Sequence, residues 1–156
     1  MSASNSALLL ASFVSGNGKK RKPMLKEPEN YIESDHFFFE ADNELEKVCN
    51  APADKPGVFK VLELRNGKIN LVFVGYTTQT AAQTKLVGLY DEIVNGIHFD
   101  KNPRKLGWTY QLIKDKTDAL DIYWYVLDKN ENPKTVQTKL LRQHFDEYGV
   151  LPKWNK

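Results

Sequence analysis

The feature that most constrains this chain is a pair of alternating apolar segments on either side of an Asn-Gly dipeptide. Residues 57–64 and 68–74 both contain apolar side chains at strand-like spacing, and Asn66 and Gly67 stand between them. Asn-Gly between two such segments is a strong short-range indication of a β-hairpin. We therefore expect two adjacent antiparallel strands within a chain of 156 residues.

Two further segments have the composition of strands. Residues 120–127 form a short apolar run rich in aromatic and branched side chains, which predicts a third, buried strand. Residues 35–40 are also rich in strand-forming residues, and they precede an expected helix over residues 43–49. This strand and helix would form an N-terminal extension of the sheet.

Three other segments predict helices. Apolar residues recur at steps of three and four over residues 81–95, and a shorter helix is expected over residues 108–116, after a loop over residues 97–107. Pro133 suits the first turn of a last helix, which Gly149 would end. The order of elements predicts an α/β fold, with a small three-stranded, mainly antiparallel sheet flanked by helices.

Length and composition restrict the class of protein. The length corresponds to one domain, and we expect an arm over residues 1–34 and a domain over residues 35–156. The single cysteine, Cys49, excludes an internal disulfide and a four-cysteine zinc site. The apolar residues 7–14 have no preceding basic residue, unlike an export signal, and no segment is long enough to cross a membrane. We therefore expect a cytoplasmic protein without a membrane partner.

Charge is distributed unevenly along the chain. Residues 31–56 carry two basic and seven acidic residues, whereas basic and aromatic side chains are interleaved between residues 101 and 116. Such a mixture is typical of surfaces that contact phosphates and stack on bases. The candidate nucleic-acid contacts are Lys85, Lys101, Arg104, Lys105 and Trp108.

The hairpin and the end of the chain resemble a known family. Gly57-Val-Phe59 and Phe73-Val-Gly75 flank the expected hairpin as the two conserved tripeptides do in the GIY-YIG nucleases, and the ending Leu151-Pro-Lys-Trp-Asn155 is similar to that of small bacterial members. The resemblance covers residues 35–156. It implies a fold in which the hairpin forms one wall of a nuclease site.

The resemblance also implies a set of catalytic roles. Family members hydrolyse a phosphodiester with one divalent ion, usually magnesium, which a glutamate on the last helix holds. Two hairpin tyrosines activate water, an arginine stabilises charge on the phosphate, and a late asparagine supports the site. The metal ion and the arginine would both stabilise the negative charge that develops in the transition state.

In this sequence most of these positions carry different chemistry. The tyrosine positions fall on Phe59 and Phe73, which have no hydroxyl group, and the metal position falls on Gln137, a poor ligand for a hard cation. The arginine position falls near Glu92, whereas Asn155 matches the family. The candidate substitutes are the hydroxyl group of Tyr76, the imidazole of His98, and the amines of Lys60 and Lys85.

The resemblance therefore predicts a nuclease fold whose hydrolytic site is degenerate. The expected function is binding of nucleic acid, with DNA as the first candidate and RNA as the second. One alternative is an active endonuclease that uses magnesium and displaced catalytic residues. Another is a regulatory domain that binds a protein partner, in which the acidic residues 31–56 would matter more than the basic loop.

Overall fold

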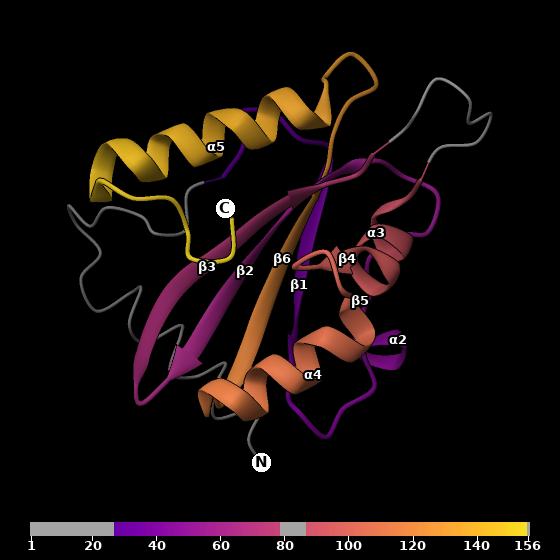
Figure 1. Cartoon of the computed structure of the whole chain (residues 1–156). Helices are drawn as coiled ribbons and strands as arrows, with labels where there is room; N and C mark the ends of the chain where they lie inside the picture. Colours follow the sequence, from indigo (N-terminus) through magenta and orange to yellow (C-terminus); the bar gives the residue numbers. More distant parts are fainter. Residues whose placement is uncertain (1–26, 79–86, 156) are drawn as a thin grey trace.

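The computed structural model describes residues 27–78 and 87–155. Its centre is a four-stranded sheet in the order β1, β6, β2, β3, with every neighbouring pair antiparallel (Figure 1). The strands are β1 (Glu33–Phe39), β2 (Gly57–Arg65), β3 (Lys68–Tyr76) and β6 (Ala119–Val126). The expected three strands are present, and the N-terminal extension adds β1 to the edge of the sheet. The predicted α/β class is confirmed.

The hairpin of β2 and β3 forms where the sequence predicts it. Asn66 and Gly67 have φ angles of 52° and 73°, in the left-handed region that two-residue hairpin turns require. Strand β6 pairs with β2 and β1, so it lies inside the sheet and seven of its eight residues are buried. Burial on both faces explains why β6 reads as a nearly continuous apolar run.

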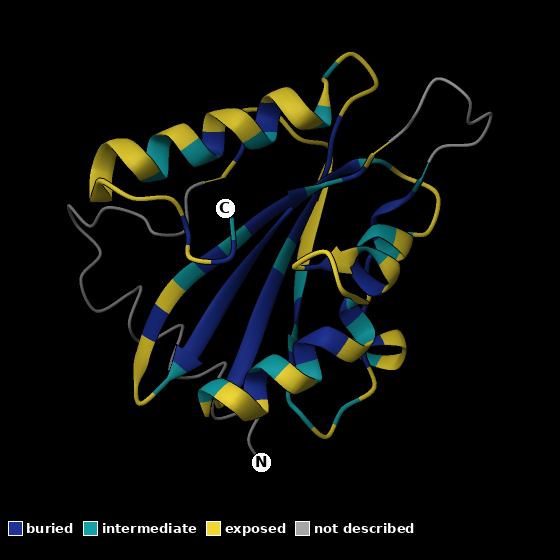
Figure 2. Cartoon of the chain, in the orientation of Figure 1, coloured by how far each residue is buried: buried dark blue, intermediate teal, exposed yellow. Residues whose placement is uncertain are grey.

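Helices cover both faces of the sheet. Helix α5 (Pro133–Tyr148) packs on one face, and α2 (Leu45–Val48), α3 (Leu89–Asn95) and α4 (Arg104–Asp115) pack on the other (Figure 1). This separation follows the alternation of side chains along each strand. Figure 2 shows that buried residues run along the central strands and exposed residues lie on the outer surfaces of the helices. Within the described ranges, no helix is long and apolar enough to cross a membrane.

Helix α5 has the expected boundaries. The side chain of Asn132 accepts hydrogen bonds from the backbone N–H groups of Lys134 and Thr135, and Pro133 occupies the first turn. Gly149 follows the helix in a left-handed conformation, with φ 77°. Both ends of α5 are therefore set by capping residues that can be recognised in the sequence.

Two of the sequence predictions need correction in this region. Helix α3 spans Leu89–Asn95, so residues 87 and 88 of the predicted helix are not helical, and its residues 81–86 lie outside the described residues. Helix α4 begins at Arg104, one turn before the predicted start at residue 108. The expected loop before it contains a two-stranded hairpin of β4 (Ile97–His98) and β5 (Asn102–Pro103). Pro103 immediately precedes the helix and fixes the chain direction at its start.

Edge strand β1 is held to β6 by a side-chain pair as well as by its backbone. The Nδ1 atom of His36 lies 2.7 Å from Oδ1 of Asp121, which is completely buried. The imidazole also stacks on the ring of Tyr123, with 4.6 Å between the ring centroids. The hydrogen bond to Asp121 raises the pKa of His36, whereas burial raises the pKa of Asp121.

This pair predicts a stability that declines at high pH. The pKa of His36 is raised in the folded protein. The stabilisation that the His36–Asp121 pair provides is therefore complete below about pH 6.5, and it is lost as the pH rises through the folded-state pKa of His36. Urea unfolding of the wild type and of His36→Gln measures this effect. The difference in unfolding free energy should be larger at about pH 6 than at about pH 9. An equal difference in unfolding free energy at the two pH values would contradict a raised pKa of His36 in the folded protein.

Candidate functional site: a cleft beside the hairpin

A cleft of about 450 Å³ lies beside edge strand β3, between the β4–β5 hairpin and the C-terminal segment. Five parts of the chain contribute to it: β3, the segment with α3 and the small hairpin, the start of α4, helix α5, and the C-terminal segment. The residues that line it are Phe73, Gly75, Tyr76, Thr78, Glu92, Ile97, Phe99, Asp100, Arg104, Gln137, Trp154 and Asn155.

Several residues that the family resemblance singles out meet at this cleft. Phe73, Tyr76, Gln137 and Asn155 line it, although they come from three separate parts of the chain. Phe59 is completely buried beneath it, with its ring centroid 5.8 Å from that of Phe73. The positions of the two family tyrosines, the metal ligand and the late asparagine are therefore close together in space.

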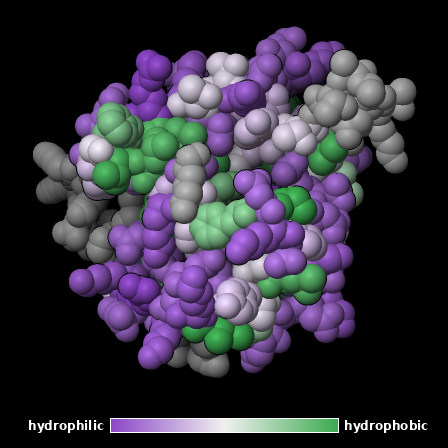
Figure 3. Space-filling model, viewed as in Figure 1, coloured by the Kyte–Doolittle hydropathy of each residue, from purple (hydrophilic) through white to green (hydrophobic). Residues whose placement is uncertain are grey.

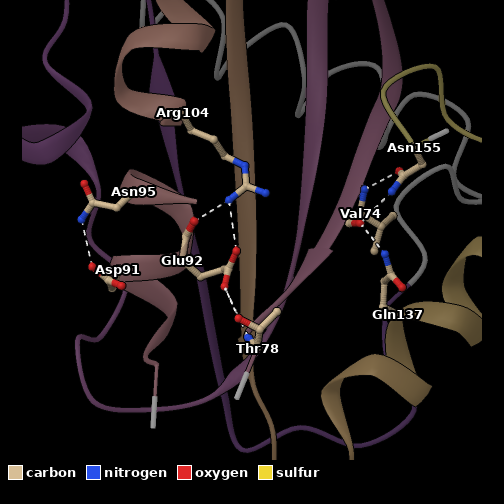
Figure 4. Close-up of polar contacts among 8 residues, drawn as sticks. All are labelled: Val74, Thr78, Asp91, Glu92, Asn95, Arg104, Gln137 and Asn155. Carbon is tan, nitrogen blue, oxygen red and sulfur yellow. Dashed lines mark hydrogen bonds and ion pairs between the residues drawn. The ribbon is translucent and has the colours of Figure 1, made fainter. Parts of the chain in front are cut away.

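The two amide side chains both bind the backbone of β3 at Val74 (Figure 4). Asn155 accepts a hydrogen bond from the Val74 N–H at 2.8 Å and donates one to its carbonyl oxygen at 3.0 Å. Nε2 of Gln137 donates to the same carbonyl oxygen at 3.0 Å. Among the described strands, β3 has no neighbour on this side, and these contacts satisfy its backbone groups there. In this arrangement the amides have a structural role at the cleft wall.

The position of Arg104 differs from the sequence prediction. We expected a basic loop residue on the surface, but Arg104 is only 5% exposed. Its guanidinium group lies 5.2 Å from the ring centroids of both Phe59 and Phe73. Arg104 is therefore buried at the cleft, where cation–π contacts hold it against the hairpin.

Glu92 holds the other side of the same guanidinium group. The Nη1 atom of Arg104 donates to the backbone carbonyl oxygen of Glu92 and lies 3.4 Å from its carboxylate. Thr78 also binds that carboxylate through its hydroxyl group, at 3.3 Å. Figure 4 shows one guanidinium nitrogen at Glu92 and another turned away from it, toward β3. The resemblance places the family arginine near Glu92, and here Glu92 instead positions an arginine from the next helix.

His98 and Trp108 are not available to a ligand in the manner predicted. His98 is buried, with Nε2 3.1 Å from Oε1 of Gln111, and its ring stacks on Phe99 at 4.1 Å. Burial lowers the pKa of His98. Trp108 is completely buried in the core beside Phe39, so its ring cannot stack on a base. The prediction for Trp108 is wrong because spacing in the sequence did not reveal which side of α4 faces the core. His98 is on β4, where Gly107 of α4 packs against its side chain.

The remaining predicted basic residues have different outcomes. Lys101 is exposed and Lys105 is half-buried, and each directly follows a residue that lines the cleft. Lys85 lies outside the described residues. Lys60 is buried on the opposite side of β2, over the rings of Tyr123 and Tyr125, and burial lowers its pKa to about 7. Lys60 therefore does not replace the family arginine.

The cleft residues do not fit the magnesium ion that the family uses. The amide nitrogen of Gln137 is directed at Val74, and the carboxylate of Glu92 is bound to Arg104. Asp100 is the remaining carboxylate among the lining residues. Over residues 27–78 and 87–155, no three potential metal ligands of the His, Cys, Asp or Glu type cluster together. The position that holds the ion in the family therefore offers no carboxylate, and the amide of Gln137 is a poor ligand for a hard cation.

Sequence reasoning missed the aromatic part of the cleft. Phe99, Ile97 and Trp154 line it, and Phe99 and Ile97 are 38% and 52% exposed. Figure 3 shows apolar residues among hydrophilic ones on this face of the molecule. Trp154 could have been found from its position beside Asn155. No local pattern in the sequence indicates the position of Phe99, because the tight turn that carries its side chain contains no glycine.

No family model, curated protein or solved structure matches the chain.

Proposed function

We propose that this protein binds nucleic acid at the cleft beside the hairpin, with DNA as the first candidate, and does not cleave it. One observation carries the proposal: Phe73, Gln137 and Asn155 line the same cleft. These positions are far apart in the sequence, and only the resemblance to nucleases connects them. That resemblance is an argument by analogy, so the chemistry of the cleft must support it independently.

The rim of the cleft supports binding of a polyanion. Lys101 lies in the turn of the β4–β5 hairpin, Lys105 lies in the first turn of α4, and Lys134 lies one helical turn before Gln137 on α5. Lysine side chains that neutralise phosphates release counterions from the nucleic acid, which favours association. Tyr76, whose side chain is half-buried at the cleft, can add a hydrogen bond to a phosphate or sugar oxygen.

The interior of the cleft supports binding without hydrolysis. Phe59 and Phe73 have no hydroxyl group to activate water, and Gln137 and Asn155 are occupied by the backbone of Val74. Loss of one group that stabilises charge in a transition state typically reduces the rate by about 100-fold or more. Because several of the family's catalytic groups are replaced here, we expect binding without hydrolysis.

A double substitution at the rim tests the proposal. Lys101→Ala with Lys105→Ala should weaken the binding of a labelled DNA oligonucleotide, measured by fluorescence anisotropy. The slope of log K against log salt should decrease in magnitude by about 1 to 2, because two phosphate contacts are removed. Lys47→Ala with Lys68→Ala is the matched control, since both lysines are exposed and neither lines the cleft: Lys47 is on α2, and Lys68 is at the turn end of β3. Equal affinities and slopes for the two variants would contradict a role for the rim.

A further inference from the structure

The turn between β4 and β5 has an unusual backbone. Phe99 and Asp100 both have positive φ angles, 55° and 58°, although neither is glycine. Side chains larger than hydrogen disfavour this left-handed conformation, which non-glycine residues adopt in tight turns and at functional sites. Both residues line the cleft. The turn therefore presents these two side chains to the cleft at a cost in backbone energy.

Phe99 is supported as an aromatic surface. Its ring stacks on that of His98 with 4.1 Å between centroids and an interplanar angle of 26°. Trp154 meets both rings edge-on, at 4.9 Å from His98 and 6.4 Å from Phe99. Because His98 and Trp154 are buried, they hold the Phe99 ring from behind while 38% of this residue stays exposed. This arrangement resembles the platforms on which unpaired bases stack.

The charges inside the cleft favour a base over a phosphate. Arg104 is the cation among the lining residues, and Glu92 neutralises it. Asp100 adds a carboxylate, which can accept hydrogen bonds from the exocyclic amino group of a base. An anionic phosphate would meet no net positive charge at this position. The phosphates would instead be held by the rim lysines.

We propose that the cleft binds an unpaired nucleobase, which stacks on Phe99 while the rim lysines hold its backbone. This inference rests on the proposed function and names its ligand class as single-stranded nucleic acid or a duplex with an unpaired base. A cleft of about 450 Å³ lies in the size range of small-molecule sites. A base inside a continuous duplex cannot reach it without leaving the stack.

The test uses a short oligothymidine that contains one 2-aminopurine, either as a single strand or paired in a full duplex. The emission of 2-aminopurine changes when it stacks on an aromatic ring. With the unaltered protein, the single strand should bind more tightly than the duplex and its emission should change on binding. Phe99→Leu should weaken single-strand binding by about tenfold, the scale expected for loss of one base stack.

A matched variant and three outcomes separate this inference from the proposed function. Tyr110→Leu removes an aromatic ring that is 69% exposed on α4 and does not line the cleft, so it should change neither affinity nor emission. Equal binding of the two oligonucleotides without an emission change would overturn the inference and leave nucleic-acid binding intact. No binding of either oligonucleotide would overturn both. The emission measurement with the unaltered protein needs no variant, so it holds even if Phe99→Leu fails to fold.

Discussion

Replacement of Arg104 by alanine should lower the free energy of unfolding by about 3 kcal/mol. The side chains of Arg104 and Glu92 are only 7% and 13% exposed, so their ion pair is largely removed from water. Loss of one partner leaves a buried charge without compensation, and that charge costs more than the pair itself contributes. The variant also removes the cation from the rings of Phe59 and Phe73. Urea unfolding followed by tryptophan fluorescence measures the change.

Neighbouring substitutions give this prediction its controls. Lys105→Ala is next to Arg104 but only partly buried, and it should change stability by less than about 0.5 kcal/mol. Adding Glu92→Gln to Arg104→Ala should recover part of the loss, because the unpaired carboxylate is then absent. A loss below about 1 kcal/mol for Arg104→Ala would contradict the buried ion pair.

Gly57→Ala should be nearly as destabilising, at about 3 kcal/mol. An added Cβ atom would overlap the backbone carbonyl oxygen of Tyr125 in β6. Strand β2 pairs with β6 on one side and with β3 on the other, so neither backbone can move away without breaking the sheet. The glycine of the first hairpin tripeptide is therefore required by close backbone packing. Thermal and urea unfolding of the variant measure the effect.

Gly67→Ala is the matched control for this prediction. Gly67 has φ 73° and open space where a Cβ atom would lie. Its replacement should therefore cost only about 1 kcal/mol, from the left-handed backbone alone. If Gly57→Ala were no more destabilising than Gly67→Ala, the close approach of β2 and β6 would be wrong.

The fold could be predicted largely because its main elements carry local signals. Asn66 and Gly67 encode the hairpin turn, and Asn132, Pro133 and Gly149 encode the ends of α5. The start of α4 carries a weaker signal, because Pro103 is compatible with both a loop and a helix start. The pairing of β1 with β6 joins segments more than eighty residues apart, and no local pattern specifies such a pairing.

The candidate site was less predictable, because burial depends on helix phase and tertiary packing. Arg104, Trp108 and Leu112 are buried at four-residue steps on one face of α4. The helix predicted from the sequence starts at residue 108 and leaves Arg104 in the preceding loop. A basic residue in a loop is expected to be exposed. One more helical turn would have placed Arg104 on the same face as Trp108. The ion pair with Glu92 could then have been considered from the sequence.

The proposed function requires that the cleft beside the hairpin binds nucleic acid without cutting it. The most direct test is a titration of isotope-labelled protein with single-stranded oligothymidine in magnesium, followed by NMR of the backbone amides and by gel analysis of the DNA. Binding at the cleft should concentrate the shifts in residues 75–78, 97–105 and 153–155, with the DNA intact. Shifts confined to β1 and α2, no shifts, or cleaved DNA would contradict it.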